Sequence, residues 1–398
     1  MGKLNETLDL ITLYKHHVGE REVPSAYDEW ACISLIAACV GNRVWFEKFQ
    51  GAKLVPNLYV MLVGPSANGK GIAIDDATLP YIAHVPMVNM YRGKATGPFI
   101  VEYLGSVQKG GWGVKNSCLY LVTPELSLSV GNGPNAEEFI KLMTELYTGG
   151  AYTYQHGTRT RGNVKVSGHT LNWFGASTEN WFVSALSKED VEGGVMGRIA
   201  VIVEPYQDVC IPEPKRSLDY YELREHIQAR IYNLLGVSGQ FAMTERAREL
   251  HNQWYHERRK ENMPSEESGL MPTWKRMDDL VLKLSMVQAL SSGRTGLQIT
   301  GDDFTQAEKW SYRALEAVPR MIALASTTKE SEGLQYVRDV IRKTELIQRQ
   351  MLIRKVAKRG ILAVRLQELV NQLEQEGSIE TSYANKSTWY TWKKRGLK

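Results

Sequence analysis

One segment of this sequence has the residue types and the spacing of a phosphate-binding loop. Its members, with the first residue that follows, are Gly64, Pro65, Ser66, Ala67, Asn68, Gly69, Lys70, Gly71 and Ile72. The glycines allow the backbone to curl until its N–H groups point at a phosphate, and the lysine adds a point charge. The pattern G-x-x-x-x-G-K therefore predicts binding of the phosphates of ATP, with a plain glycine turn as the alternative.

The residue after the lysine weakens the expected metal site. A serine or threonine usually stands there, and its hydroxyl binds Mg²⁺. This chain has Gly71 instead, so Mg²⁺ would be held through water or, as a weaker alternative, by Asp75 or Asp76. The sequence thus supports nucleotide binding more strongly than efficient hydrolysis.

Further polar groups for ATP hydrolysis are expected at the ends of two later strands. Glu125 follows an apolar run and could polarise the attacking water, although Pro124 replaces the aspartate that usually orders magnesium. Ser177, Thr178 and Asn180 follow another apolar run and are candidates to contact the γ-phosphate. An ordinary helix cap is the alternative interpretation for these three residues.

Arg198 follows a glycine-rich segment, residues 193–197, immediately before a strand. An arginine at such a turn can project into the ATP of a neighbouring subunit and stabilise the charge of the transition state. A surface salt bridge is the alternative.

Apolar runs that alternate with helices position these groups. Four continuous apolar runs, typical of parallel strands covered on both faces, occupy residues 57–63, 117–123, 170–176 and 199–204. A helix is predicted over residues 137–147 and a hairpin over residues 151–166. This order predicts an α/β fold with a parallel sheet.

Four parts are expected along the chain. They are a helical N-terminal segment (1–50), a P-loop core (51–210), a helical domain (211–328) and a C-terminal domain (329–398). Helices predicted at 334–342, 346–357 and 364–376, followed by a hairpin, give the last part the order of a winged helix.

Positive charge is concentrated in that last part. From residue 331 onward there are 14 Lys/Arg and 7 Asp/Glu, which suggests a polyanionic partner. The expected DNA contacts are Arg159, Arg161 and Lys165 on the predicted hairpin and Lys358, Arg359, Arg365, Lys386 and Lys393 in the tail. A solvated helical face, or a winged helix that docks on protein, is the alternative.

Composition excludes several classes of protein. The four cysteines form no CxxC pair and lie near no histidine cluster, which fits a reducing compartment and argues against structural zinc. No apolar run reaches about 18 residues, so no membrane span is expected. A cytoplasmic location, in a bacterial host cell if the chain belongs to a phage or mobile element, is predicted.

Taken together, the motifs resemble a phage and mobile-element family of primase-helicase-type P-loop proteins, and more widely superfamily 3 and AAA+ helicases. The resemblance spans about residues 25–325 and is carried by Pro56–Tyr59, Gly64–Gly71, Pro124–Ser127, Glu145–Gly149, Gly175–Thr178, Gly197-Arg198, Trp274–Arg276 and Lys283-Leu284. It implies an AAA+ or RecA-like core, a ring that is expected to be a hexamer, ATP and Mg²⁺ between subunits, and movement along single-stranded DNA during replication. It also implies the roles given above to Lys70, Glu125, Ser177/Thr178 and Arg198.

Three functional hypotheses remain open. The first is a ring-forming, ATP-driven DNA helicase or translocase. The second is a replication initiator or helicase loader that uses ATP binding as an assembly switch, which the altered magnesium ligands favour. The third is a small-molecule kinase, against which the basic tail argues.

Overall fold

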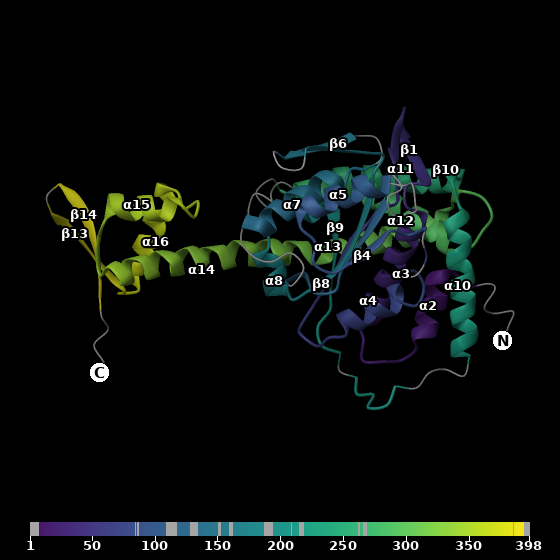
Figure 1. Ribbon diagram of the computed structural model, residues 1–398, viewed down its shortest axis with the longest axis horizontal. Helices are drawn as coiled ribbons and strands as arrows, with labels where there is room; N and C mark the ends of the chain where they lie inside the picture. Colours follow the sequence, from purple (N-terminus) through teal and green to yellow (C-terminus); the bar gives the residue numbers. More distant parts are fainter. Residues whose placement is uncertain are drawn as a thin grey trace. The chain divides into compact units, whose positions relative to one another are not determined.

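The chain forms two compact units, Met1–Ile322 and Ala323–Lys398, with the boundary inside helix α14 (Val318–Thr344) (Figure 1). The computed structural model describes all residues except 1–7, 84, 86, 109–117, 128–133, 150–152, 159–161, 187–193, 208, 215–218, 262, 266–268, 385 and 394–398. Among the described helices, none combines the length and the apolarity that crossing a bilayer requires.

A five-stranded parallel sheet organises the larger unit. Its strands are β3 (Tyr59–Val63), β4 (Met90–Arg92), β5 (Cys118–Thr123), β8 (Thr170–Ser177) and β9 (Ile199–Val203), in the order β4-β5-β8-β3-β9. All four strands predicted from continuous apolar runs are present, and the predicted α/β class with a parallel sheet is confirmed. The short edge strand β4 was not predicted.

Two neighbouring strands of this sheet send the chain in opposite directions. β3 leads through α4 (Lys70–Thr78) to β4 at one edge, whereas β8 leads through α8 (Glu179–Ser184) to β9 at the other edge. Because crossovers between parallel strands are right-handed, these two connections lie over opposite faces. The carboxyl ends of β3 and β8 therefore flank the point where ligands bind in open α/β sheets.

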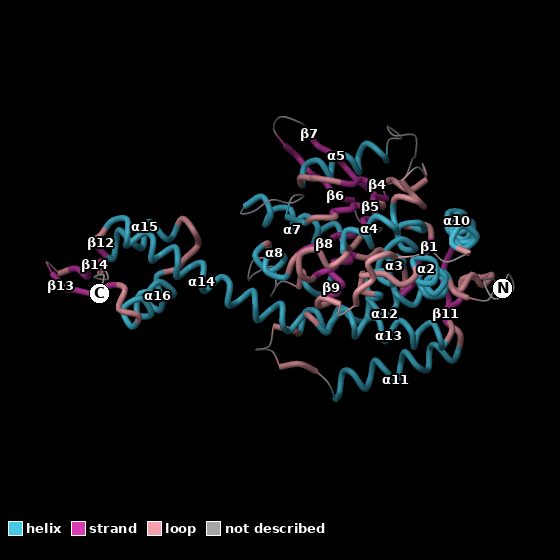
Figure 2. The backbone as a smooth tube through the Cα atoms, turned by 90° about the horizontal axis from the view of Figure 1, so that it is seen from below, coloured by secondary structure: helices cyan, strands magenta, loops and turns pink. Residues whose placement is uncertain are grey.

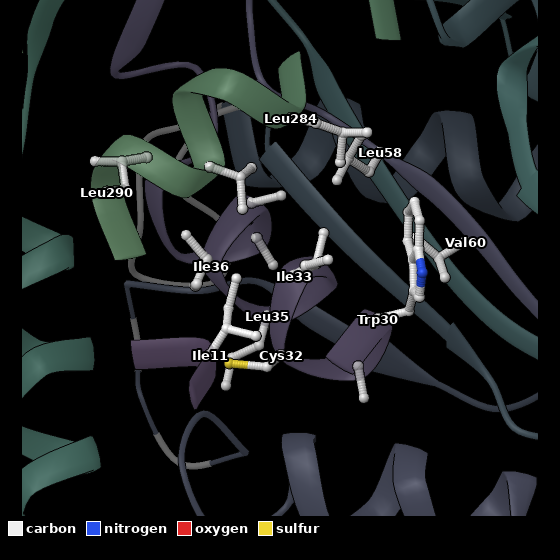
Figure 3. Packing of buried hydrophobic residues seen from close by; sticks show 14 of the residues in the cluster. Ile11, Trp30, Cys32, Ile33, Leu35, Ile36, Leu58, Val60, Leu284 and Leu290 are labelled. Atoms are coloured by element: carbon white, nitrogen blue, oxygen red, sulfur yellow. The ribbon is translucent and has the colours of Figure 1, made fainter. Parts of the chain in front are cut away.

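Helix α3 (Ser25–Val40) is the centre of the core on one face of the sheet. It packs between α2 (Leu10–Val18), α12 (Met271–Ser291) and strand β3 (Figure 3). Trp30 and Ile33 of α3 face Leu58 and Leu284, and all four side chains are buried. Helices α5 (Gly97–Gln108) and α7 (Pro134–Leu146) serve the other face, where Phe139 contacts the ring of Trp173 edge-on.

The helical segment after the sheet completes the larger unit. It contains α10 (Tyr220–Gly236), α11 (Glu245–Glu261), α12 and α13 (Gly301–Glu316), and the last three lie side by side (Figure 2). A capping box starts α13, because Thr300 and Asp303 satisfy each other's backbone N–H groups. The core cluster takes residues from Leu10 to Ala314, so all three of the first predicted parts share it.

The prediction that residues 1–50 are wholly helical is wrong. Strand β1 (Val44–Phe49) forms a second sheet with β2 (Ala52–Leu54), β10 (Gly239–Met243) and β11 (Gln298–Ile299). The pairing of β1 with β10 is parallel and joins segments almost 200 residues apart. Such a partner cannot be read from local periodicity, which also explains why β10 and β11 were missed in the predicted helical part.

The predicted hairpin of the larger unit is present as β6 (Thr153–Thr158) and β7 (Gly162–Ser167), antiparallel and in register. It lies near the upper margin of Figure 1, and β7 packs on α5. Gly105 of α5 permits this contact, because a Cβ there would lie 2.7 Å from a methyl of Val164.

The smaller unit has its own core and a three-stranded sheet. Beyond the second part of α14 come β12 (Leu346–Gln348), α15 (Arg349–Ala357), α16 (Ala363–Gln375), β13 (Ile379–Ala384) and β14 (Ser387–Trp392). The strand order is β12-β14-β13, and the core includes Val337, Leu352, Leu369 and Tyr390.

One expectation for this unit is wrong. Residues 346–348 were expected to begin a helix, but they pair with Trp389–Thr391 as strand β12. The reversal occurs at Glu345, whose positive φ of 54° ends α14. The preceding helix is also longer than predicted, since α14 begins at Val318 rather than near residue 334.

A buried lysine ties α12 to the start of β3 and should make stability depend on pH. Lys283 Nζ donates to the backbone oxygen (3.1 Å) and to Oδ1 (2.7 Å) of Asn57, and lies 3.9 Å from the centre of the Tyr147 ring. Burial lowers the pKa of Lys283 from 10.5 to about 7. Between those values the unfolded chain binds more protons than the folded one, so stability rises with pH across that window. We expect urea titrations to show a free energy of unfolding that increases from pH 7 to pH 9, and less steeply in Lys283→Met; equal slopes in both proteins would contradict this.

Candidate functional site

The predicted phosphate loop lies at the carboxyl edge of the parallel sheet, between a strand and a helix. β3 ends at Val63, the loop turns over residues 64–69, and α4 begins at Lys70. The loop is anchored to the neighbouring strand β8, because the N–H of Gly64 donates to the carbonyl of Ser177 (3.2 Å). Ala67 and Gly69 have positive φ values of 62° and 72°, which curl the backbone. This strand–loop–helix arrangement is the one that directs backbone N–H groups and a helix N-terminus at an anion.

Two glycines of the loop are required by packing, and a third is not. A Cβ on Gly64 would lie 2.6 Å from the carbonyl oxygen of Glu204, and a Cβ on Gly69 would lie 2.7 Å from a methyl of Val23. Around Gly71, in contrast, a Cβ would meet nothing within 4 Å. The glycine that replaces the usual hydroxyl residue is therefore not demanded by the fold.

Lys70 is folded back over its own loop. Its ammonium donates to the carbonyl oxygens of Gly64 (3.0 Å) and Pro65, and the residue is only 8% exposed. Burial lowers the pKa of Lys70, while the nearby carboxylate of Glu125 acts in the opposite direction. The ammonium thus sits on the loop's carbonyls rather than among the apolar core residues, and phosphate oxygens can take the place of those two carbonyls.

Three residues that the sequence analysis missed brace the loop. Tyr27 of α3 donates its hydroxyl to the carbonyl of Val63 (2.6 Å). Asn68, within the loop, donates through Nδ2 to the carbonyls of Glu204 (3.1 Å) and Pro205 (2.9 Å). Tyr206 reaches in from beyond β9 and donates to the carbonyl of Ser66 (2.9 Å). These contacts fix the loop against α3 and the end of β9, and their partners are too distant in sequence to be recognised as pairs.

Glu125 lies at the same edge of the sheet, beyond the end of β5. Its side chain is exposed, and Oε1 accepts a hydrogen bond from the hydroxyl of Ser127 (2.8 Å). The influence of Glu125 on the pKa of Lys70 shows that the two charges face the same space. A carboxylate at this position can accept a proton from water, as the sequence analysis expected.

Ser177 and Thr178 end the strand that separates β3 from β5. Ser177 is buried, and its hydroxyl donates to the carbonyl of Thr178 (3.0 Å). Thr178 is the N-cap residue of α8, but its side chain makes no capping hydrogen bond. The structure therefore brings Lys70, Glu125 and Ser177 to one edge of the sheet, with the serine on the strand between the other two.

The weakly predicted metal ligands are engaged elsewhere. Asp75 forms an ion pair with Arg92 at the end of β4, and Asp76 forms one with Arg21, which also binds Asp28. In the part of the chain that the structure describes, no group of three or more His, Cys, Asp or Glu side chains converges as a metal site. The prediction that Asp75 or Asp76 holds Mg²⁺ gains no geometric support.

The open space around Gly71 permits a direct test of the magnesium hypothesis. We expect Gly71→Ser to fold normally, because serine fits without a clash and is a better helix former than glycine. If a missing hydroxyl limits turnover, the variant should hydrolyse ATP about tenfold or more faster at the same Mg²⁺ concentration. Gly71→Ala, which fills the same space without a hydroxyl, is the matched control; an equal gain in both variants would contradict the hypothesis.

Arg198 lies at the opposite edge of the sheet from the loop. It directly precedes β9, which runs parallel to β3 with Ile199 beside Tyr59 and Val203 beside Val63. Five residues of strand therefore separate Arg198 from the level of the loop, or about 16 Å. Arg198 cannot reach the phosphate loop of its own chain across that span.

The Arg198 side chain is half-buried beside a second arginine. Its Nη1 donates to the carbonyl of Gly194 (2.9 Å), and Nη1 of Arg276 donates to the carbonyl of Pro272 (3.2 Å). Burial lowers the pKa of Arg198, and the charge of Arg276 lowers it further. Among the described residues, neither guanidinium has a carboxylate within ion-pairing distance, so the surface salt bridge considered as an alternative for Arg198 is not seen there.

The residues expected to contact DNA differ in how available they are. Arg159 and Arg161 fall outside the described residues, whereas Lys165 is exposed on β7. In the smaller unit Lys358, Arg359 and Lys386 are exposed, while Arg365 pairs with Glu368 and Lys393 with Glu380 (3.4 Å). The available cations of that unit are thus concentrated at the end of α15 and at the β13–β14 turn.

Comparison with known proteins adds no family to this geometry. No protein-family model matches the chain, and no curated protein is similar to it in sequence.

Proposed function

We propose that this protein binds ATP at residues 64–71 and uses it to act on DNA, as a ring-forming helicase or translocase in the replication of a phage or mobile element. The observation that carries the proposal is the curled loop at the carboxyl edge of the parallel sheet, with Lys70 folded over it and Glu125 facing the same space. Loop amides, a helix N-terminus and one ammonium together suit a triphosphate.

The placement of Arg198 supports assembly into a ring. An arginine that cannot reach its own phosphate loop, and that has no carboxylate partner among the described residues, is suited to a nucleotide held by a neighbouring subunit. Rings arise when one surface of a subunit binds a different surface of the next. We propose a hexamer in which Arg198 completes the site of its neighbour.

The smaller unit supports contact with DNA. Its order of helix, short strand, two helices and hairpin, with β12 paired to β14, is that of a winged helix. The excess of positive charge in this part of the chain suits a polyanion. We propose that this unit binds duplex DNA, and that the β6–β7 hairpin with Lys165 contacts single-stranded DNA.

A second function is favoured by one specific observation. Gly71 supplies no hydroxyl for magnesium, and the fold does not demand a glycine at that position. A replication initiator or helicase loader that needs ATP only as an assembly switch would tolerate this loss. The switch differs from the motor in turnover and not in binding.

One pair of measurements tests the proposal and separates its two forms. ATP turnover is measured with and without single-stranded DNA, and the mass of the assembly is measured with and without ATP. A motor gives turnover that DNA stimulates and a ring-sized mass in ATP. A switch gives the same change in mass with little turnover, whereas turnover that ignores DNA in a monomer would refute both.

A further inference from the structure

The second helix of the C-terminal pair, α16, presents an unusual face to solvent. α16 buries Leu366, Leu369, Val370 and Leu373 in the core of the smaller unit. The opposite side exposes Val364, Gln367, Glu368 and Asn371, at the i, i+3, i+4 and i+7 spacing of one helical face, here called the α16 face. Val364 is 78% exposed.

The α16 face is separate from the positive charge of the unit. Arg365 is the one Lys or Arg in the sequence of α16, and it pairs with Glu368 on the same helix. The preceding helix and its end carry the exposed cations Arg354, Lys355, Lys358 and Arg359. One helix therefore offers charges for phosphates, while the next offers amide, carboxylate and apolar groups.

These groups match the edges of particular bases. Asn and Gln amides bind adenine through its N6 and N7 atoms, and apolar side chains contact the methyl group of thymine. A carboxylate accepts from N4 of cytosine but faces only acceptors on the major-groove edge of guanine. Gln367 Nε2 donates to Asn371 Oδ1 (3.0 Å), which orients the two amides along one side of the helix.

We propose that α16 reads A·T base pairs in the major groove of duplex DNA, with Gln367 and Asn371 on adenine and Val364 on a thymine methyl. The cations of α15 hold the flanking phosphates, which set position but carry no sequence information. This inference rests on the DNA-binding part of the proposed function and adds the sequence class that this part recognises.

Charge favours DNA over a protein as the occupant of the α16 face. Leu362 and Val364 are both strongly exposed, and apolar side chains of this kind also suit a protein partner. The exposed cations on the adjacent helix complement phosphates at both sides of a groove. A duplex satisfies the apolar, amide and cationic groups at once.

The test uses the full chain without nucleotide and a library of duplexes with a randomised core. Bound duplexes are sequenced, and affinities for the selected and a scrambled duplex are measured by fluorescence anisotropy at several salt concentrations. Gln367→Ala/Asn371→Ala removes the proposed readout. Lys355→Ala/Lys358→Ala is the matched double variant that removes phosphate contacts only, and circular dichroism checks the fold of each.

We expect the library to be enriched in A·T pairs and the amide variant to lose about tenfold in affinity per side chain on the selected duplex alone. The lysine variant should bind both duplexes more weakly, with a salt slope lower by about two. Absence of enrichment, or an amide variant that keeps its preference, would overturn the readout. Failure of the folded protein to bind any duplex would overturn it too and indicate a protein partner, while ATP turnover with single-stranded DNA tests the motor separately.

Discussion

Replacing Lys70 with alanine is expected to reduce ATP turnover by about 100- to 1000-fold, the effect of removing one preorganised donor from a charged transition state. The ammonium of Lys70 lies over the loop, on the carbonyls of Gly64 and Pro65, and is the one side-chain cation of the loop. Its loss leaves only backbone amides to balance the terminal phosphates, so binding of ATP should weaken as well. Turnover and ATP affinity are measured by phosphate release and by calorimetry.

A matched lysine separates this effect from a general loss of charge. Lys309→Ala removes an exposed cation from α13, which contributes no side chain to the loop. That variant should keep the turnover and the affinity of the original protein. Unchanged turnover in a correctly folded Lys70→Ala protein would remove the phosphate-binding role from this loop.

Replacing Arg198 with alanine is expected to reduce DNA-stimulated turnover by about a thousandfold, the usual contribution of an arginine supplied from a neighbouring subunit. Because Arg198 lies at the far edge of the sheet from its own loop, ATP binding to the isolated chain should be unchanged. Arg198→Lys keeps the charge but loses the planar donor geometry, and should recover little of the rate. Arg276→Ala shows whether the neighbouring guanidinium acts together with Arg198.

Mixing two inactive variants tests whether Arg198 acts between subunits. A Lys70→Ala subunit still carries Arg198, and an Arg198→Ala subunit still carries Lys70. In a ring assembled from equal amounts of both, roughly one site in four contains both residues, because each site combines different surfaces of two subunits. Recovered turnover in the mixture is the expected result, and a mixture as inactive as its components would assign Arg198 a role within its own chain.

The parts of the fold that could be predicted are those written in local sequence. Strands β3, β5, β8 and β9 are continuous apolar runs because helices cover both faces of their sheet, and such runs leave a strong signal. β1, β10 and β11 left no such signal, since their pairing depends on segments almost 200 residues apart. β12 was missed because its strand conformation depends on pairing with β14, more than 40 residues later.

The candidate site divides in the same way. The loop from Gly64 to Gly71 was predictable, because its glycines and lysine are contiguous and follow a buried strand. The meeting of Lys70 and Glu125 at one edge followed from the rule that parallel strands end together. The bracing by Tyr27, Asn68 and Tyr206 could not be predicted, since each of these side chains binds a backbone carbonyl, which has no signature in the sequence.

Hydrogen exchange of the loop amides, followed by mass spectrometry, tests the central claim most directly. If N–H groups of residues 64–71 hold the phosphates of ATP, adding ATP and Mg²⁺ should slow exchange there and leave the exposed hairpin of β1 and β2 unchanged. The slowing should disappear in Lys70→Ala at the same ATP concentration. Equal exchange with and without saturating ATP in the original protein would contradict the account of this loop as the site where the nucleotide is held.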